Sequence, residues 1–306
     1  MLRFIIRRLL VTIPMILVVI TLTWGLIRLA PGNFYSGEKK IPKAVEKNIR
    51  EKYGLNKPWY VQYGRTMGHI VRLDFGDSLK YQGQSVNTII ARSLPVSAIV
   101  GILAYVLALI VGITVGSIAA LKQNSKWDYA SMALAMLGIS IPNFVLGPLL
   151  VLLFSLALYW LPPSRWSGFP SRSVVLPVLT LSAIYMAYIA RLTRAGMLEV
   201  LRSDYIRTAR AKGLRERDVV IRHALRGGIM PVVSFTGPAL AFLLTGTVVV
   251  ERIFALPGLG NYFIQASLNR DEPLILGIVA FIAMTLLIMN LLVDIAYAFL
   301  DPRIRY

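Results

Sequence analysis

Six long stretches of this 306-residue chain contain no charged side chain, and they constrain its fold more than any other feature. A helix that crosses the roughly 30 Å hydrocarbon core of a membrane needs about 20 apolar residues, because each residue rises about 1.5 Å. We therefore predict an all-α polytopic membrane protein with six transmembrane helices. The stretches are Leu9–Ile27, Leu94–Leu121, Tyr129–Arg165 up to its charged end, Ser173–Ala190, Gly227–Val250 and Pro273–Val293.

Two of these stretches call for a further interpretation. The first follows a basic start and could be a signal peptide, but it exceeds the usual 7–15 apolar residues and five more stretches follow, so a retained span is favoured. The third is longer than one straight crossing requires. Its segment Ser140-Ile141-Pro142-Asn143, together with Pro148, predicts a kink or a break, because proline removes a backbone donor and clashes with the preceding turn.

The distribution of basic residues predicts which way the chain faces. It has 33 Lys and Arg against 15 Asp and Glu, a net charge of +18, which fits either a nucleic-acid footprint or membrane topology. Seventeen of the basic residues fall in 1–8, 122–126, 191–226 and 303–305, which six spans place on one side, against four in the two short opposite loops. The positive-inside rule then puts both termini in the cytoplasm, and a nucleic-acid partner is disfavoured. The segment Pro31–Ser93 carries eleven more Lys and Arg residues on the other side. Loops of about that length largely escape the positive-inside rule.

This topology divides the chain into four parts. Residues 1–30 are an N-terminal tail with the first span, and residues 31–93 are an extracytoplasmic loop with short amphipathic helices. Residues 94–301 are a five-helix core that includes the cytoplasmic loop 191–226, and residues 302–306 are a cytoplasmic tail. In the outer loop we predict helices over Pro42–Gly54 and Pro58–Leu73, the second with Trp59, Tyr63, Met67, Ile70 and Val71 aligned. Packing on the membrane surface or on each other is favoured for both helices, and contact with a soluble partner stays open.

The cytoplasmic loop predicts two short basic helices separated by a glycine. Ser203 or Asp204 can cap a helix over Tyr205–Lys212, and Gly213 can supply the left-handed residue that ends it. A second helix over Arg215–Leu225 would place Ile221 over Leu225 and Val220 over Ala224. Such a pair can dock into a groove on another protein, or it can lie on anionic lipid. The residues alone leave both interpretations open.

Several kinds of chemistry are missing from the sequence. The chain has no cysteine, its histidines His69 and His223 are far apart, and no GxxxxGK[ST] or GxSxG pattern occurs. Only Asp294 places a carboxylate within or near the end of a span, and we expect it to be structural rather than part of a pore. These features predict a non-catalytic chain without its own cofactor, and they suggest the transmembrane half of a machine that another subunit powers.

Six segments resemble one family of transporters. Tyr205–Leu214 with Arg222–Arg226 is similar to the cytoplasmic "EAA" loop of importer-type ABC permeases, in its dipeptide/oligopeptide/nickel branch, although Arg207 stands where the general pattern has an acidic residue. The resemblance extends along nearly the whole chain, and the stretch Leu121–Tyr129 with the long outer loop most resembles the B-type subunits of oligopeptide permeases. The other matching segments are Arg28–Gly32, Leu73–Ser78, Glu251–Gly260 and Asp301–Tyr306.

The resemblance implies a type I ABC importer permease in a bacterial inner membrane. It implies a homologous C-type permease subunit, two cytoplasmic ATPase subunits that bind ATP and Mg, and an extracytoplasmic peptide-binding protein as partners. Dipeptide, nickel or other small-solute transport stays open, and the missing carboxylates disfavour a stand-alone channel or secondary carrier.

The resemblance also implies two sites. In the ATPase-docking loop, Ala209 and Ala211 would permit close approach and the arginines would meet acidic groups. Gly258 and Gly260 would serve a tight turn near the binding protein. The docking residues are Tyr205, Arg207, Thr208, Ala209, Arg210, Ala211, Lys212 and Gly213, and those of the turn are Glu251, Pro257, Gly258 and Gly260.

Overall fold

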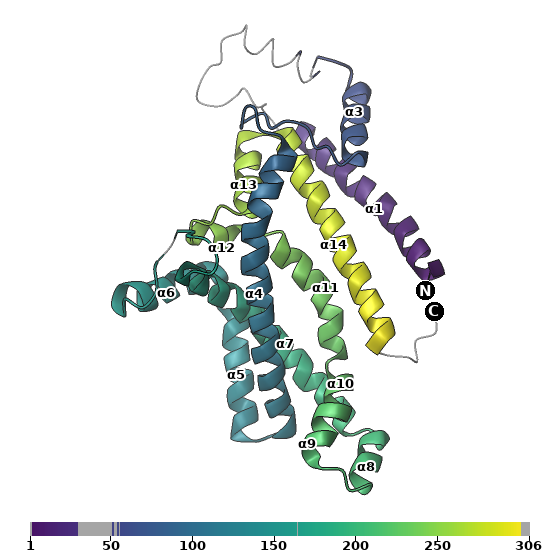
Figure 1. Ribbon diagram of the computed structural model, residues 1–306, viewed down its shortest axis with the longest axis vertical. Helices are drawn as coiled ribbons and strands as arrows, with labels where there is room; N and C mark the ends of the chain where they lie inside the picture. Colours follow the sequence, from purple (N-terminus) through teal and green to yellow (C-terminus); the bar gives the residue numbers. More distant parts are fainter. Residues whose placement is uncertain (1, 30–50, 52–53, 55, 164, 301–306) are drawn as a thin grey trace. The chain divides into compact units, whose positions relative to one another are not determined.

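Figure 1 shows a computed structural model of the chain, which describes residues 2–29, 51, 54, 56–163 and 165–300. Within these ranges every regular element is a helix, and a single bridge between Asp77 and Ser85 is the one strand-like pairing. The all-α prediction is therefore confirmed. The main helices are α1 (Leu2–Leu29), α3 (Trp59–Val71), α4 (Val86–Leu121), α5 (Lys126–Ser140), α6 (Asn143–Val151), α7 (Val175–Leu201), α8 (Asp204–Ala211), α11 (Met230–Leu244), α12 (Val248–Ile253), α13 (Leu259–Asn269) and α14 (Glu272–Leu300).

Length and apolar composition mark four of the described helical segments as able to cross a membrane. They are Val86–Leu121, Arg172–Leu201, Met230–Ile253 and Glu272–Val293. A bent pair, Lys126–Ser140 with Asn143–Ala157, meets the same requirement when it is counted as one span. The first predicted stretch is the helix α1, whose apolar part Ile13–Leu29 is shorter. Four or five spans follow from this criterion, and the count of six stays a prediction.

The third stretch bends where the sequence predicts. Its two helices, α5 and the segment that begins with α6, differ in direction by 102°. Ile141 and Pro142 between them are extended, with ψ angles of 112° and 145°. A residue before proline avoids the helical region, and proline has no backbone N–H to donate. Pro148, in contrast, lies inside α6, which continues into the π-helix η2 (Leu152–Ala157).

The fifth stretch is interrupted, whereas the sequence predicts a continuous helix. α11 ends at Leu244 and α12 begins at Val248. Between them Gly246 has a φ of +88°, a conformation that side chains rarely adopt. A Cβ atom at this glycine would overlap the carboxylate of Glu251, which accepts a hydrogen bond from Ser97 Oγ at 2.7 Å. The break therefore depends on one glycine, and a search for long apolar stretches does not distinguish this glycine from the residues around it.

The chain divides into two compact units, and the first comprises residues 1–96 and 257–287. One of its cores joins α1, α3 and α14, and another joins the start of α4 to α13 and α14. The predicted helix over residues 58–73 is confirmed as α3. Its residues Tyr63, Met67 and Ile70 pack against α1 and α14, whereas Trp59 and Val71 are exposed. The helix predicted over residues 42–54 lies outside the described residues, apart from positions 51 and 54.

A buried carboxylate joins the loop of the first unit to α14. Asp271, just before α14, is fully buried. It accepts hydrogen bonds from the Ser78 hydroxyl and from the backbone N–H groups of Leu79 and Lys80, at 3.1 and 3.0 Å. It also accepts the Leu274 N–H at 3.3 Å. Since its acceptors are occupied by this loop and by its own helix, Asp271 fixes the loop to the head of α14.

The second unit comprises residues 97–256 and 288–306 and is built around α7. Glycines allow its helices to approach closely. A Cβ atom at Gly112 of α4 would come 2.7 Å from Ile189 Cγ2 of α7, and one at Gly196 of α7 would overlap the carbonyl oxygen of Gly228. The side chain of Asp294, for which we predict a structural role, lies outside what the structure describes.

Candidate functional site

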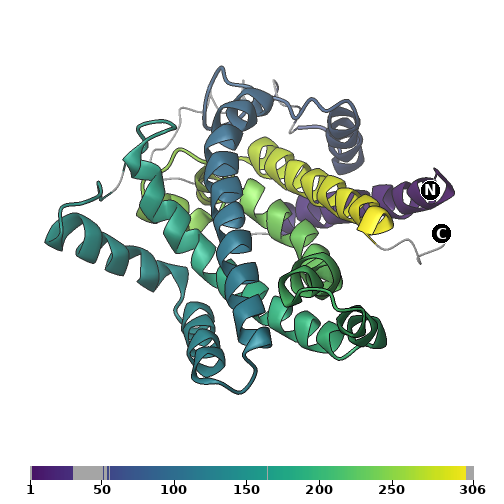
Figure 2. The same ribbon diagram turned by 60° about the horizontal axis from the view of Figure 1, so that its bottom comes forward.

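The two predicted basic helices of the cytoplasmic loop form a compact projection at the end of α7, and we call residues 203–228 the docking segment (Figures 1 and 2). The first helix is α8, one residue from the predicted bounds at each end. Gly213 follows it with a φ of +77° and donates its N–H to the Arg210 carbonyl at 2.9 Å. The predicted glycine stop is therefore confirmed. Ser203 occupies the capping position, but its hydroxyl donates to the Val200 carbonyl and does not cap α8.

The second predicted helix is longer and less regular than the sequence indicates. α9 (Glu216–Asp218), the π-helix η4 (Val219–Ala224) and α10 (Leu225–Gly228) follow one another without a break. The i→i+5 hydrogen bonds of a π-helix rotate the side chains relative to those of an α-helix. Ile221 lies in this segment and is 52% exposed.

One face of α8 is buried against the chain itself. Ile206 is fully buried and Ala209 is 7% exposed, and both lie in a core with Met197, Val219 and Ala224. The small side chain at position 209 therefore allows α8 to approach its own chain, and the close approach of a partner at Ala209 stays a prediction. The opposite face is exposed and carries Tyr205, Arg207, Thr208, Ala211 and Lys212.

Arg210 joins α8 to the helix that follows the glycine. Its guanidinium donates two hydrogen bonds to Glu216, at 2.7 and 3.1 Å. These bonds lower the pKa of the Glu216 carboxyl and raise that of Arg210. A bidentate pair across the Gly213 turn limits the angle between the two helices. Arg210 thus has an acidic partner in its own chain, and a contact of the arginines with acidic groups of a partner stays a prediction.

Two other arginines of the segment are more open. Arg207 lies 3.5 Å from Asp204, with 73% of its side chain exposed, and Arg222 lies 3.4 Å from Asp218, with 77% exposed. Pairs this exposed contribute little to stability, so their charges stay accessible to a partner. Lys212 at the end of α8 adds another exposed cation beside Gly213.

A buried ion pair supports α7, from which the docking segment projects. The Arg194 guanidinium donates to both carboxylate oxygens of Asp128, at 2.6 and 2.7 Å, and Asp128 also accepts the N–H of Asn124 at 3.0 Å. This interaction ties the turn before α5 to α7. A single acidic residue in an otherwise basic loop is the only signal in the sequence that could have indicated it.

The predicted binding-protein turn is mostly buried. Glu251 is 3% exposed, Gly258 and Gly260 are buried, and Pro257 is exposed. Gly258 is extended, with a φ of −92°, and precedes α13, whose first turn contains Gly260. Ala255 has a left-handed φ of +49°. A tight turn at the two glycines near a binding protein stays a prediction. Within the described residues no group of three His, Cys, Asp or Glu side chains could hold a metal ion.

Two family descriptions match nearly the whole chain. Residues 112–306 match the binding-protein-dependent transport system inner membrane component, and residues 1–101 match the N-terminal part of such a membrane component. The oligopeptide transport system permease protein OppB of Escherichia coli K12 is 47% identical over 306 residues, with 100% of both chains covered. The dipeptide transport system permease protein DppB of Bacillus subtilis is 45% identical over 305 residues, which cover 100% of this chain and 98% of that one.

A solved structure shares the fold at low sequence identity. It is an inward-facing conformation of the MetNI methionine ABC transporter, of which one chain is 15% identical to this one with a TM-score of 0.56. The match covers 70% of this chain and 96% of that one. The two chains therefore share a fold.

Proposed function

Because this chain belongs to the family of binding-protein-dependent transport system inner membrane components, we propose that it is the permease subunit of an ATP-driven importer of oligopeptides. We propose six spans, of which α1 is the first and the bent pair of α5 and α6 the third. Residues 31–93 are then an extracytoplasmic loop, residues 94–301 contain the five-helix core, and residues 302–306 are a tail. Both termini face the cytoplasm of a bacterial cell and the spans cross its inner membrane.

The docking segment is the observation that carries this proposal. It presents an exposed basic face on α8, while Ile206 and Ala209 attach the same helix to the chain. A partner that pushes on such a helix moves α7 and the packed helices with it, whereas a flexible loop would absorb the movement. We propose that an ATPase subunit binds the exposed residues of this face and the turn at Gly213.

The subunits around the chain divide the work. Two ATPase subunits bind ATP and Mg, and this chain supplies no catalytic group. A homologous C-type permease completes the membrane pathway, and an extracytoplasmic binding protein delivers the peptide near the segment that contains Glu251, Pro257, Gly258 and Gly260. Closure of the ATPase dimer on ATP can reorient the pathway only if the closed dimer binds one conformation of the docking segment better than the other.

Charge reversal on the exposed face tests this function. We expect Arg207→Glu with Lys212→Glu to weaken binding of the ATPase subunits and ATP-driven peptide uptake in proteoliposomes by about tenfold or more, since both charges face a partner. Lys126→Glu is the matched control, because this exposed lysine is the first residue of α5 and lies outside the docking segment. Normal ATPase binding by the double variant would place the docking site elsewhere.

Two further measurements separate the competing functions. ATP hydrolysis by this chain alone, or peptide uptake by this chain alone without ATP, would contradict the importer and favour an enzyme or a stand-alone carrier. The dipeptide permease of B. subtilis, at 45% identity, supports dipeptide transport as the second candidate. Competition between labelled oligopeptides and dipeptides in the complete importer distinguishes the two substrates.

A further inference from the structure

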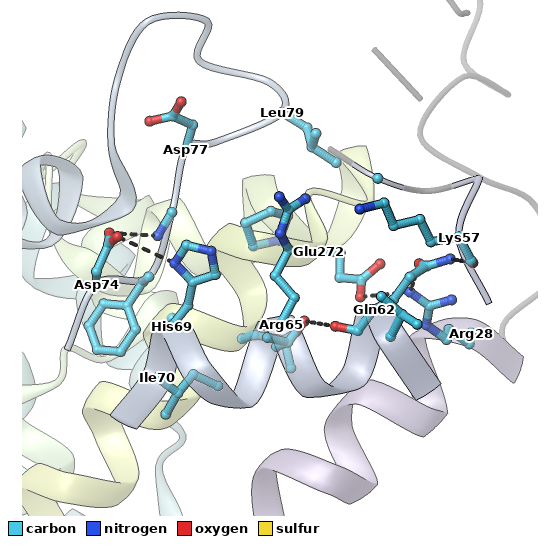
Figure 3. A pocket seen from close by; sticks show the side chains of 18 residues that line it. Arg28, Lys57, Gln62, Arg65, His69, Ile70, Asp74, Asp77, Leu79 and Glu272 are labelled. Carbon is cyan, nitrogen blue, oxygen red and sulfur yellow. Dashed lines mark hydrogen bonds and ion pairs between the residues drawn. The ribbon is translucent and has the colours of Figure 1, made fainter. Parts of the chain in front are cut away.

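A pocket of about 380 Å³ lies within the first compact unit, which comprises residues 1–96 and 257–287. It is enclosed by the end of α1, by α3, by the loop that follows α3 and by the head of α14 (Figure 3). Its size is within the range of about 300–1,000 Å³ that is usual for small-molecule sites. The proposed topology places most of this lining in the extracytoplasmic loop.

The pocket is lined by both acidic and basic side chains. Figure 3 shows Asp74 and Asp77 at one end, Lys57 at the other, and Arg65 reaching up between them. The carboxylates of Asp74 and Asp77 belong to exposed residues. Asp74 accepts hydrogen bonds from His69 Nδ1 at 3.3 Å and from the Gly76 N–H at 3.1 Å, which fix its position on the rim.

Two basic side chains of the pocket, Lys57 and Arg65, keep their donors available. Arg28 is committed to its own chain, because it pairs with Glu272 at 3.3 Å and donates to Gln62 Oε1 at 2.6 Å. No carboxylate of the described residues forms an ion pair with Lys57 or Arg65. Among the residues that the structure describes, Lys57 and Arg65 therefore add positive charge to the pocket that no ion pair compensates.

The chain also leaves room for the arginine. Gly54 has a φ of +66°, and a Cβ atom there would come 2.9 Å from Arg65 Nη1. The lysine is held by its backbone, since Gln62 Nε2 donates to the Lys57 carbonyl at 2.6 Å. Apolar side chains of Ile70, Leu79 and Leu276 also line the pocket. A ligand with opposite charges at its ends and an apolar middle matches this arrangement.

We propose that this pocket binds a short zwitterionic peptide, with its C-terminal carboxylate at Lys57 and Arg65 and its N-terminal ammonium group at Asp74 and Asp77. Every unblocked peptide carries these two charges whatever its sequence, so a dipolar pocket recognises peptides as a class. The apolar side chains that line it accommodate variable side chains without selecting one. The proposal rests on the peptide-import function, and it adds a substrate site in the permease itself.

Three ligands test the site in the assembled permease–ATPase complex in nanodiscs, without the binding protein. They are tri-alanine, its C-terminal amide and its N-acetyl derivative, each titrated by ligand-observed NMR. We expect tri-alanine to bind about tenfold or more tightly than either blocked peptide, because each block removes a charge-assisted interaction. Equal binding of the three ligands would overturn the proposal.

Two double variants test which pocket residues bind the carboxylate of the peptide and which bind its ammonium group. Lys57→Gln with Arg65→Gln should abolish the preference for the free carboxylate and keep the preference for the free amine. Asp74→Asn with Asp77→Asn should do the reverse. Arg72→Gln is the matched control, since this exposed arginine directly follows α3 and does not line the pocket. A pair that weakens all three ligands equally would indicate a distorted loop and would overturn the assignment.

Two more readouts distinguish the other outcomes. If Lys57→Gln with Arg65→Gln weakens docking of the peptide-free binding protein while tri-alanine binding is unchanged, an acidic group of that protein occupies the pocket and the proposal is wrong. ATP-driven uptake of tri-alanine by the complete importer, measured in parallel, tests the function separately. Uptake without binding at the pocket overturns the pocket alone, and absence of uptake overturns the import of peptides.

Discussion

Two segments of this chain are each held in shape by a carboxylate, but in opposite surroundings. In the first unit Asp271 is fully buried and accepts hydrogen bonds from one hydroxyl and three backbone N–H groups. In the docking segment Glu216 is 58% exposed at its side chain and is bonded to the single guanidinium of Arg210. The same functional group thus fixes one loop permanently and the other only weakly.

The two carboxylates differ in whether water can replace the hydrogen bonds that they accept. When a buried acceptor is lost, its donors remain unsatisfied in a place that water reaches poorly, and each of them costs free energy. When an exposed acceptor is lost, water bonds to the freed guanidinium and the loss is small. A segment that must change its contacts during each transport cycle can use the second arrangement, whereas a loop that supports a pocket needs the first.

The largest effect should come from the buried carboxylate. We expect Asp271→Ala to lower the free energy of unfolding of the complex by about 3 kcal/mol or more, because Ser78, Leu79 and Lys80 lose their acceptor. The thermal unfolding midpoint of the nanodisc complex measures this. Asp77→Ala, which removes an exposed carboxylate from the same loop, is the control. Similar midpoints for both variants would show that burial does not distinguish the two carboxylates.

The second-largest effect should come from the turn between the helices of the docking segment. We expect Gly213→Pro to abolish peptide uptake while membrane insertion persists, because proline requires a φ near −65° where the chain has +77°. The variant also loses the N–H that donates to Arg210. Gly213→Asn is the control, since asparagine tolerates the left-handed region and should retain most of the uptake. Proteoliposome uptake and membrane fractionation check both variants, and normal uptake by the proline variant would contradict the docking role.

The parts of this structure that depend on neighbouring residues could be predicted from the sequence. Apolar length indicates the helices of the spans, proline at 142 indicates the bend, and glycine at 213 ends α8. These signals act within a few residues, so a single sequence contains them. The break at Gly246 was missed because one glycine in an apolar run is compatible with a helix as well as with a break.

The parts that depend on distant residues could not be predicted. Ser78 and Asp271 are 193 positions apart, and Asp128 and Arg194 are 66 apart, so neither pair forms a local pattern. The buried face of α8 was also missed. Its Ala209 matches a family motif, and only the packing of Met197 and Val219 shows that this alanine faces inward. The contact between Arg210 and Glu216 could not be predicted either, because the distance between the two side chains depends on the turn at Gly213.

The Arg210–Glu216 pair should affect docking more than stability. We expect Arg210→Gln and Glu216→Gln each to cost less than about 1 kcal/mol of folding free energy, because both groups are solvated. Each should nevertheless weaken ATPase binding several-fold, since the angle of α8 is no longer limited. The exchange Arg210→Glu with Glu216→Arg should restore part of that binding. Additive losses in this double-mutant cycle would show that the pair does not position the helix.

The smallest expected effect is the pH dependence of the same pair. The hydrogen bonds from Arg210 hold the pKa of Glu216 below its ordinary value of 4.5 in the folded chain. A carboxyl whose folded pKa is lowered contributes stability above its unfolded pKa, and this contribution disappears as the pH falls through the folded pKa.

The difference in thermal midpoint between the wild-type complex and Glu216→Gln should therefore stay constant from about pH 8 to pH 5 and shrink below about pH 4. It should also decrease with added salt, because the pair is exposed. The buried Asp271 provides the contrast, since its bonds are shielded from ions and the deficit of Asp271→Ala should be nearly independent of salt. A Glu216 deficit that is equally insensitive to salt would mean that solvent does not distinguish the two carboxylates.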